Sequence, residues 1–239
     1  MGGTASNLTR RATVPAPNDI ETSKGNIIVH GLVLSTNTQR VLVTLAEKGL
    51  KYELKPLKIM ESEQKSRQYV EGMQPFGLFP VLIDTDGFKI YESRAICRYL
   101  EEKYKGKGTE LIPSKDIQAR AFFEQAANIE AFNFDPPANA LIRETVVKKI
   151  FYQKEPDPIK VAQYREDLGS KLNVYENILS KQPYLAGQVY TMADLFHLPC
   201  AQFIIKFGDG DLFESRPNVK QWWERISSRP SWKAVQEMK

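Results

Sequence analysis

Two serines stand where a hydroxyl and free backbone amides could act together on an anion. Ser35 follows the buried run 27–29 and precedes a helical stretch, and Ser93 follows Glu92 at the start of another. The first turn of a helix leaves backbone N–H groups unpaired and carries the positive end of the helix dipole. A hydroxyl at that position therefore adds to an anion site. On the residues alone, the alternative is that each serine only caps its helix.

Cysteine and histidine offer little other chemistry. The chain has two cysteines, Cys97 and Cys200, and two histidines, His30 and His197. These positions make no disulfide framework and lack the spacing of a metal site, so we expect no zinc. The two cysteines favour a reducing compartment, and we expect a cytoplasmic protein whose cysteines are small core residues.

The composition limits the possible classes of protein. Of the 239 residues 42% are hydrophobic, which is enough for a core and excludes disorder of the whole chain. No uninterrupted hydrophobic run exceeds three residues, so we expect no membrane span. The net charge of +4 is small and scattered, so no nucleic-acid partner is expected.

Residues 26–104 alternate between strand and helix patterns. Asp86-Gly87 lies between two apolar runs and predicts a type I′ hairpin, in which both central residues have positive φ. The whole order is strand, helix, strand, helix, strand, strand, helix. It predicts a mixed sheet covered by helices, an α/β thioredoxin-like domain. In order, the elements are expected near residues 27–29, 35–48, 52–54, 63–70, 81–83, 88–91 and 93–104.

The remaining residues have helical periods only. Thr191 and Asp194 have the spacing of a capping box, with Tyr190 and Leu195 as its hydrophobic staple. We expect a disordered leader over residues 1–24, the α/β domain over 25–105, a linker over 106–115 and an all-α domain over 116–239. Two apolar stripes are expected to face the helical core: Phe122, Phe123, Ala126, Ile129 and Phe132, and Tyr164, Leu168, Leu172, Tyr175 and Leu179.

This architecture and four sequence stretches resemble the cytosolic glutathione transferases, most closely the phi class. The resemblance runs in order from about residue 26 to the end of the sequence. It implies the glutathione transferase fold: an N-terminal thioredoxin-like domain followed by an all-α domain. The stretches are 35–37 (STN), 74–80 (QPFGLFP), 92–96 (ESRAI), and 216–230, which contains two Arg-Pro pairs and Trp222-Trp223.

The resemblance implies that Ser35 is the catalytic residue. A thiol with a pKa of about 8.5 is only a few per cent ionised at pH 7, so the enzyme must stabilise the thiolate of glutathione. In the family the matching serine donates a hydrogen bond to the sulfur. Thr36 is a rival hydroxyl one residue later. Thiol–disulfide exchange is not expected, because no cysteine stands at this position.

The same resemblance implies the glutathione-binding residues. Pro80 matches the family's cis proline, so that the backbone of Phe79 would pair with the cysteinyl unit. Glu92 would bind the ammonium group and Ser93 the γ-glutamyl carboxylate. The glycyl carboxylate would lie at Gln64 and Lys65. Gln64 replaces the family's histidine and Leu78 replaces its glutamine, so the affinity for glutathione could be weaker or depend on other groups. For Pro80 and Lys65 the alternatives are a trans proline that starts a strand and a solvated lysine.

The second substrate is expected to be a hydrophobic electrophile, with reduction of organic hydroperoxides as a further activity. Its pocket would be lined by Leu34, Thr36, Met60, Phe132 and Phe134, although such aromatic residues are more often part of a core. Two other hypotheses remain at this point: a non-catalytic carrier of hydrophobic ligands, and a scaffold for protein association. The resemblance also implies a homodimer and no cofactor other than glutathione as co-substrate.

Overall fold

The α/β half contains one four-stranded mixed sheet. The computed structural model describes residues 25–238, so the predicted leader lies outside the described residues. The strand order is β2-β1-β3-β4, in which β1 pairs in parallel with β2 and antiparallel with β3, and β3 pairs antiparallel with β4. This is the mixed sheet that the strand and helix patterns predict. The strands are β1 (Ile27–Gly31), β2 (Tyr52–Pro56), β3 (Val81–Ile83) and β4 (Lys89–Tyr91).

The turn between β3 and β4 differs from its prediction. The amide of Gly87 donates to the carbonyl of Asp84, and the amide of Asp84 donates to the carbonyl of Phe88. Gly87 has a φ of 83°, but Asp86 is not among the described residues with positive φ. The hairpin is therefore present, but it is not the predicted type I′ turn, which needs positive φ at both central residues.

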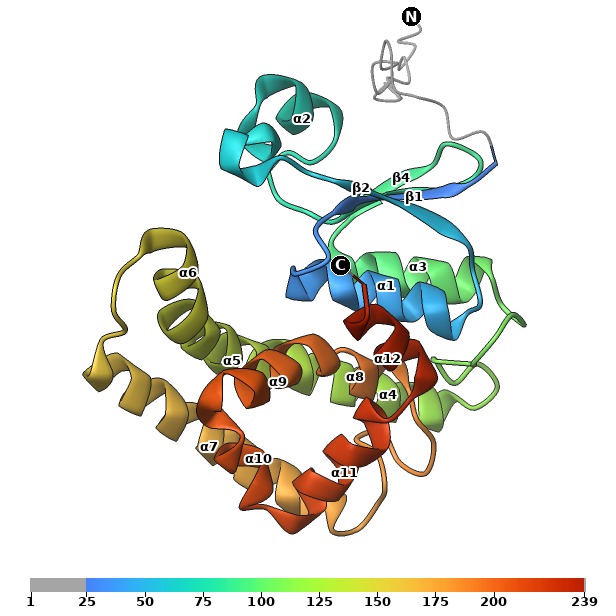
Figure 1. Ribbon diagram of the computed structural model, residues 1–239. Helices are drawn as coiled ribbons and strands as arrows, with labels where there is room; N and C mark the ends of the chain where they lie inside the picture. Colours follow the sequence, from blue (N-terminus) through green and yellow to red (C-terminus); the bar gives the residue numbers. More distant parts are fainter. Residues whose placement is uncertain (1–24, 239) are drawn as a thin grey trace, which may run out of the picture.

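Three helices cover the sheet. Helix α1 (Thr36–Glu47) begins after Ser35, whose hydroxyl accepts the amide of Thr38 at 3.3 Å, and it is followed by Gly49 with a φ of 63°. Helices α1 and α3 (Ser93–Lys103) lie between the sheet and the helical half, and α2 (Arg67–Gly72) lies on the other side of the sheet (Figure 1). Two 3₁₀ turns, Ile59–Glu61 and Glu63–Lys65, precede α2.

A long helical run opens the second half and contains two π segments. Pro136 and Pro137 have no N–H to donate to the turn before them, and the helix is widened there. In the first π segment the amide of Asp135 donates to the carbonyl of Glu130. The run consists of α4 (Ile117–Ile129), η3 (Glu130–Phe134), α5 (Asp135–Ile142), η4 (Arg143–Val147) and α6 (Lys148–Tyr152).

The remaining elements are α7 (Pro158–Leu179), α8 (Met192–Leu195), α9 (Leu198–Ile204), η5 (Ile205–Asp209), α10 (Asp211–Glu214), α11 (Pro217–Ser227) and α12 (Pro230–Gln236). Helices α7, α8 and α9 pack against the long run, α10 and α11 pack against α7, and α12 packs against α1 (Figure 1). Of the two predicted stripes, the one on α7 lies against the core, with Leu168, Leu172, Tyr175 and Leu179 buried. The stripe on α4 is only partly correct, because Phe122 and Phe132 are exposed.

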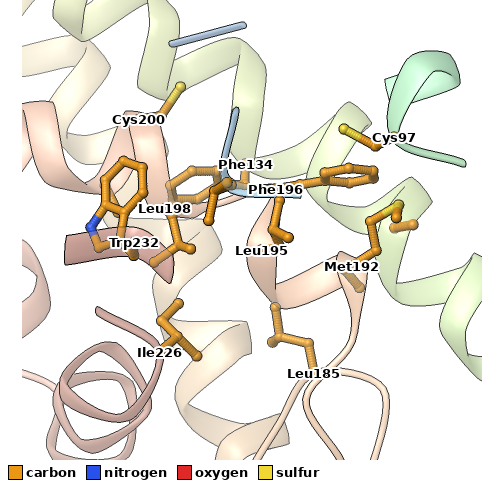
Figure 2. Close-up of a cluster of buried hydrophobic side chains, with 14 of the residues drawn as sticks. Cys97, Phe134, Leu185, Met192, Leu195, Phe196, Leu198, Cys200, Ile226 and Trp232 are labelled. Atoms are coloured by element: carbon orange, nitrogen blue, oxygen red, sulfur yellow. The ribbon is translucent and has the colours of Figure 1, made fainter. Parts of the chain in front are cut away.

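The core extends through both halves. Figure 2 shows part of it, including Cys97, Cys200 and Trp232, and both cysteines are fully buried as expected. The predicted capping box at Thr191 is present. The buried Asp194 carboxylate also accepts the amide of Leu185 at 2.9 Å and the Nε1–H of Trp222 at 2.9 Å. The box therefore links the start of α8 to the preceding loop and to α11.

The two halves are also held together at the end of α1. The carboxylate of Glu47 accepts both Nε and Nη2 of Arg229, at 2.6 and 2.7 Å, and the hydroxyls of Thr109 and Ser231. These bonds bring α12 beside α1 (Figure 1). The segment predicted as a linker contributes buried residues as well, since Leu111 and Ile112 belong to the core.

None of the helices within residues 25–238 combines the length and the apolar character needed to cross a membrane.

Candidate active site

A cleft of about 780 Å³ lies between the two halves of the protein. Its α/β wall includes Gln74, the segment 78–80 and the segment 92–94. Its helical wall is formed by α5, η4 and α6, together with Tyr164 of α7. Four of the predicted glutathione-binding residues therefore share this cleft: Phe79, Pro80, Glu92 and Ser93.

The loop at Phe79 is held from both sides. The peptide bond between Phe79 and Pro80 is cis, as the resemblance implies. The buried Gln74 side chain accepts the amides of Phe76 and Leu78 at 2.7 and 3.0 Å, and the hydroxyl of Tyr69 donates to the carbonyl of Leu78 at 2.9 Å. These bonds fix the backbone that leads into the cleft. Leu78 itself lines the cleft and brings no polar side-chain group.

Glu92 and Ser93 lie at the start of α3. Glu92 is exposed and has a φ of 69°, a backbone conformation that few residues other than glycine adopt. Ser93 is buried, and its hydroxyl accepts Nη1 of Arg40 at 2.9 Å. The same Arg40 nitrogen donates to Asn37 at 2.7 Å, and Asn37 also lines the cleft. One buried guanidinium therefore connects the starts of α1 and α3.

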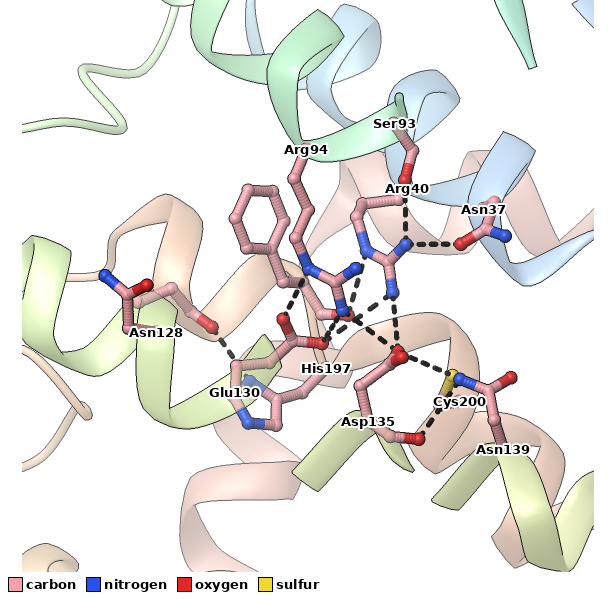
Figure 3. Close-up of polar contacts among 12 residues, drawn as sticks. Asn37, Arg40, Ser93, Arg94, Asn128, Glu130, Asp135, Asn139, His197 and Cys200 are labelled. Atoms are coloured by element: carbon pink, nitrogen blue, oxygen red, sulfur yellow. Dashed lines mark hydrogen bonds and ion pairs between the residues drawn. The ribbon is translucent and has the colours of Figure 1, made fainter. Parts of the chain in front are cut away.

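A largely buried network of charges reaches the wall of the cleft through Arg94 and Asp135 (Figure 3). Arg94 donates to both carboxylate oxygens of Glu130, at 2.7 and 2.8 Å, and lies 2.9 Å from Asp135. Arg40 lies 3.3 Å from Asp135 and 3.7 Å from Glu130. Burial by itself would raise the pKa of Glu130, but the charges of Arg40 and Arg94 hold it below its usual value. Both carboxylates come from the first π segment and the start of α5, so the widened helix supplies the acidic partners.

Ser35 is not one of the residues that line the cleft. It is half-buried at the N-terminus of α1, two residues before Asn37. Its oxygen accepts the amide of Thr38, and within residues 25–238 its own O–H donates to no other group. Thr36 is also half-buried and does not line the cleft.

Gln64 and Lys65 do not line the cleft, but they lie next to the loop that does. The ammonium group of Lys65 donates to the carbonyl of Phe76 at 3.1 Å. A Cβ added to Gly77, whose φ is 62°, would lie 2.7 Å from the carbonyl oxygen of Gln64. Because only glycine permits this approach, Gly77 brings the segment at residues 64–65 against the loop.

The five residues predicted to form the hydrophobic pocket do not line this cleft. Leu34, Met60 and Phe132 are exposed, the last with 74% of its surface accessible. Phe134 is fully buried, with its ring centroid 4.6 Å from that of His197, so it packs in the core and cannot line an open pocket.

Sequence reasoning missed the residues that form the helical wall: Asn139, Ala140, Arg143, Glu144, Lys148, Tyr152 and Tyr164. A local signal was available in part, because Asn139 and Arg143 are four residues apart and so share a helix face.

His197 supports the network from within the core. Its Nδ1 lies 2.8 Å from the carbonyl of Ala193, and its Nε2 lies 3.0 Å from the hydroxyl of Tyr175. The carbonyl can only accept, so Nδ1 carries the proton and Nε2 accepts from Tyr175. Complete burial lowers the pKa of His197 to about 4, which keeps the imidazole neutral at physiological pH.

Comparison with known proteins gives one consistent answer. Residues 29–108 match the family model of the glutathione S-transferase N-terminal domain, and residues 136–230 match that of the C-terminal domain. A glutathione S-transferase of Arabidopsis thaliana is 44% identical over 82% of this chain and 88% of its own length. The crystal structure of glutathione transferase F7 from Populus trichocarpa superposes with a TM-score of 0.85 and 36% identity, covering 88% of this chain and 98% of that one.

A third similar protein has been solved with a glutathione conjugate bound. It is glutathione S-transferase I from maize in complex with an atrazine glutathione conjugate. It is 30% identical to this chain with a TM-score of 0.81, and the match covers 88% of this chain and 96% of the maize chain.

Proposed function

The chain belongs to the glutathione S-transferase family and has phi-class relatives, and from this premise we propose that Ser35 activates the thiol of glutathione. The reaction class is conjugation: the sulfur of glutathione forms a bond to an electrophilic carbon. With an aryl halide, the halide leaves with the bonding electron pair and the thiol proton goes to solvent. A carrier that turns nothing over is not favoured, because the relatives are named as transferases.

The observation that carries the proposal is the position of Ser35. It caps α1 two residues before Asn37, which lines the cleft together with Phe79, Glu92 and Ser93. Its O–H is free to donate to sulfur, while the α1 dipole places partial positive charge nearby. Lowering the thiol pKa by about two units requires about 2.7 kcal/mol of preference for the thiolate, which a charge-assisted hydrogen bond and a helix dipole can supply together.

Glutathione would bind with its γ-glutamyl end at α3. Ser93 is already oriented by Arg40, so its hydroxyl can donate to the carboxylate, and exposed Glu92 would bind the ammonium group. The backbone of Phe79 would pair with the cysteinyl unit. Gln64 and Lys65, beside the same loop, would bind the glycyl carboxylate, for which Lys65 exchanges its bond to the carbonyl of Phe76.

Several wider features belong to the same proposal. The electrophile has a hydrophobic body, and organic hydroperoxides are a second class of substrate. The protein acts as a homodimer in the cytoplasm. Sedimentation velocity measures the oligomeric state, and fractionation of cells measures the location.

The test compares Ser35→Ala with Thr36→Ala. If Ser35 lowers the thiol pKa by about two units, about one half of the bound thiol is ionised near pH 6.5 in the parent protein and about one hundredth in Ser35→Ala. The rate of conjugation of 1-chloro-2,4-dinitrobenzene should therefore be about fifty-fold lower in Ser35→Ala. The ultraviolet absorbance of the bound thiolate is followed as the pH is varied. The midpoint of this titration should move toward about pH 8.5 in Ser35→Ala. Thr36→Ala should keep the parent profile. A Ser35→Ala protein with the parent activity and titration would show that Ser35 only caps α1.

A further inference from the structure

The charged residues of the cleft do not all have partners within it. Its lining contains Arg94, Arg143 and Lys148 as cations, and Glu92, Asp135 and Glu144 as anions. Arg94 is paired with Asp135, and Lys148 is paired with Glu144. Glu144 also accepts the amide of Asp157 at 2.6 Å, which holds its carboxylate in place. Among residues 25–238, two opposite charges of the lining are therefore left without an ion pair: Glu92 and Arg143.

These two charges belong to different halves of the protein. Glu92 precedes α3 in the α/β half, whereas Arg143 begins η4 in the helical half. Under the proposed function Glu92 binds the ammonium group of glutathione. No carboxylate within residues 25–238 lies within 4.0 Å of the Arg143 guanidinium, which is exposed. Arg143 is thus available to an anion that enters the cleft on the side of the second substrate.

The surroundings of Arg143 suit an aromatic carboxylate. The aromatic Tyr152 and Tyr164 and the apolar Pro136 and Ala140 line the same wall. A guanidinium binds a carboxylate through two parallel hydrogen bonds, a geometry that a lysine cannot match. An occupant with a flat apolar body and one carboxylate would therefore satisfy both parts of this wall.

We propose that Arg143 determines specificity for the second substrate and selects electrophiles that carry a carboxylate. The inference rests on the proposed function and names its substrate class. For an aryl enone acid, the thiol proton goes to solvent and the sulfur of glutathione bonds to the β-carbon. The C=C pair then forms the bond between the α-carbon and the carbonyl carbon, while the C=O pair moves to the oxygen. As the carbonyl re-forms, the α-carbon takes one proton from solvent, and no group leaves. The carboxylate is bound by Arg143 and takes no part in bond making.

The experiment uses ethacrynic acid and its methyl ester, which share one enone but differ in charge. The readout is the ratio of kcat/KM for the acid to kcat/KM for the ester, in the whole protein and in Arg143→Gln. We expect the ratio to fall about tenfold in Arg143→Gln, since a charge-assisted hydrogen bond is lost for the acid alone. Lys149→Gln is the matched control, because Lys149 is exposed on the same helical run and does not line the cleft. Its ratio should equal that of the parent.

A glutathione titration separates the two possible sources of the carboxylate. If Arg143→Gln raises KM for glutathione tenfold and leaves the acid-to-ester ratio unchanged, Arg143 binds glutathione and the inference is overturned. Equal loss of both enone substrates would also overturn it, because Arg143 would then not distinguish charge.

Calorimetry with the saturated, unreactive analogue of ethacrynic acid tests Arg143 without turnover. We expect binding about tenfold weaker in Arg143→Gln, and equal binding would overturn the inference. If the parent protein binds the analogue in this way but conjugates neither enone nor 1-chloro-2,4-dinitrobenzene, the proposed function fails while the anion site stands.

Discussion

Replacing Glu130 with glutamine should destabilise the protein far more than a surface change of the same kind. The Glu130 carboxylate is fully buried, accepts two hydrogen bonds from Arg94 and lies 3.7 Å from Arg40. Glutamine removes the charge and leaves the fully buried Arg40 and the largely buried Arg94 without this partner charge. Breaking a buried ion pair on one side costs about 3–5 kcal/mol. Asp135, with 22% of its side chain accessible, still lies beside both arginines, so we expect the lower end, about 3 kcal/mol.

Thermal unfolding gives the measurement. For a chain of this length about 1 kcal/mol corresponds to about 2–4 °C, so Glu130→Gln should lower the Tm by about 6–12 °C. Glu124→Gln is the matched control on α4. Glu124 pairs with Arg98 at 3.1 Å and Arg120 at 3.5 Å, but 37% of its side chain is exposed. An exposed pair contributes at most about 1 kcal/mol. If the two variants lose similar amounts, the network does not stabilise the protein as argued.

The pH dependence of the same variant provides an independent check. The folded protein holds the pKa of Glu130 below its ordinary value of 4.5, and the unfolded chain does not. The stabilisation from its charge is therefore complete above about pH 4.5 and is lost as the pH falls through the folded-state pKa. The difference in stability between the parent and Glu130→Gln should shrink in that acidic range. A difference that stays constant down to the acid transition would refute the charge-based explanation.

Two further predictions concern the helical core. Asp194→Ala removes the acceptor of the Leu185 and Thr191 amides and of the Trp222 indole. Because three buried donors lose their partner, the free energy of unfolding measured in urea should fall by about 3–5 kcal/mol. A fall below about 1 kcal/mol would contradict this. His197 should stay neutral in the folded protein down to about pH 4, as followed by NMR of its imidazole protons. The unfolded chain binds a proton at this histidine near pH 6.5, so His197 lowers the stability of the fold as the pH falls from about 6.5 toward 4. A titration midpoint above about pH 6 for His197 in the folded protein would show that the imidazole is not held neutral.

The parts of the fold that sequence reasoning predicted correctly depend on local patterns. Ser35 as the cap of α1, Gly49 after its end and the box from Thr191 to Asp194 all follow from neighbouring residues. The order of strands and helices follows from the periods of apolar residues. The grouping of Phe79 with Glu92 and Ser93 in one cleft was suggested by the family resemblance, because nothing local relates these segments.

The parts that were missed depend on helix phase and on long-range pairing. Each π segment adds a residue to a turn, so a stripe drawn at the α-helical period no longer identifies the face of Phe132. Arg40 and Glu130 have the charge of surface residues, yet each is buried by partners far along the chain. One sequence does not show which arginine meets which glutamate. For the same reason Arg143 could not be assigned to the cleft.

The contacts of the Glu47 carboxylate affect how this protein folds while it is being translated. Its partners Arg229 and Ser231 lie 182 and 184 positions later in the chain. While those residues are still being translated, the α/β half has been synthesised in full, but this acidic group has neither of them to bind. Nascent α/β segments should therefore be more easily cleaved by proteases than the same segments after release, and the last helices would complete the first domain as well as their own.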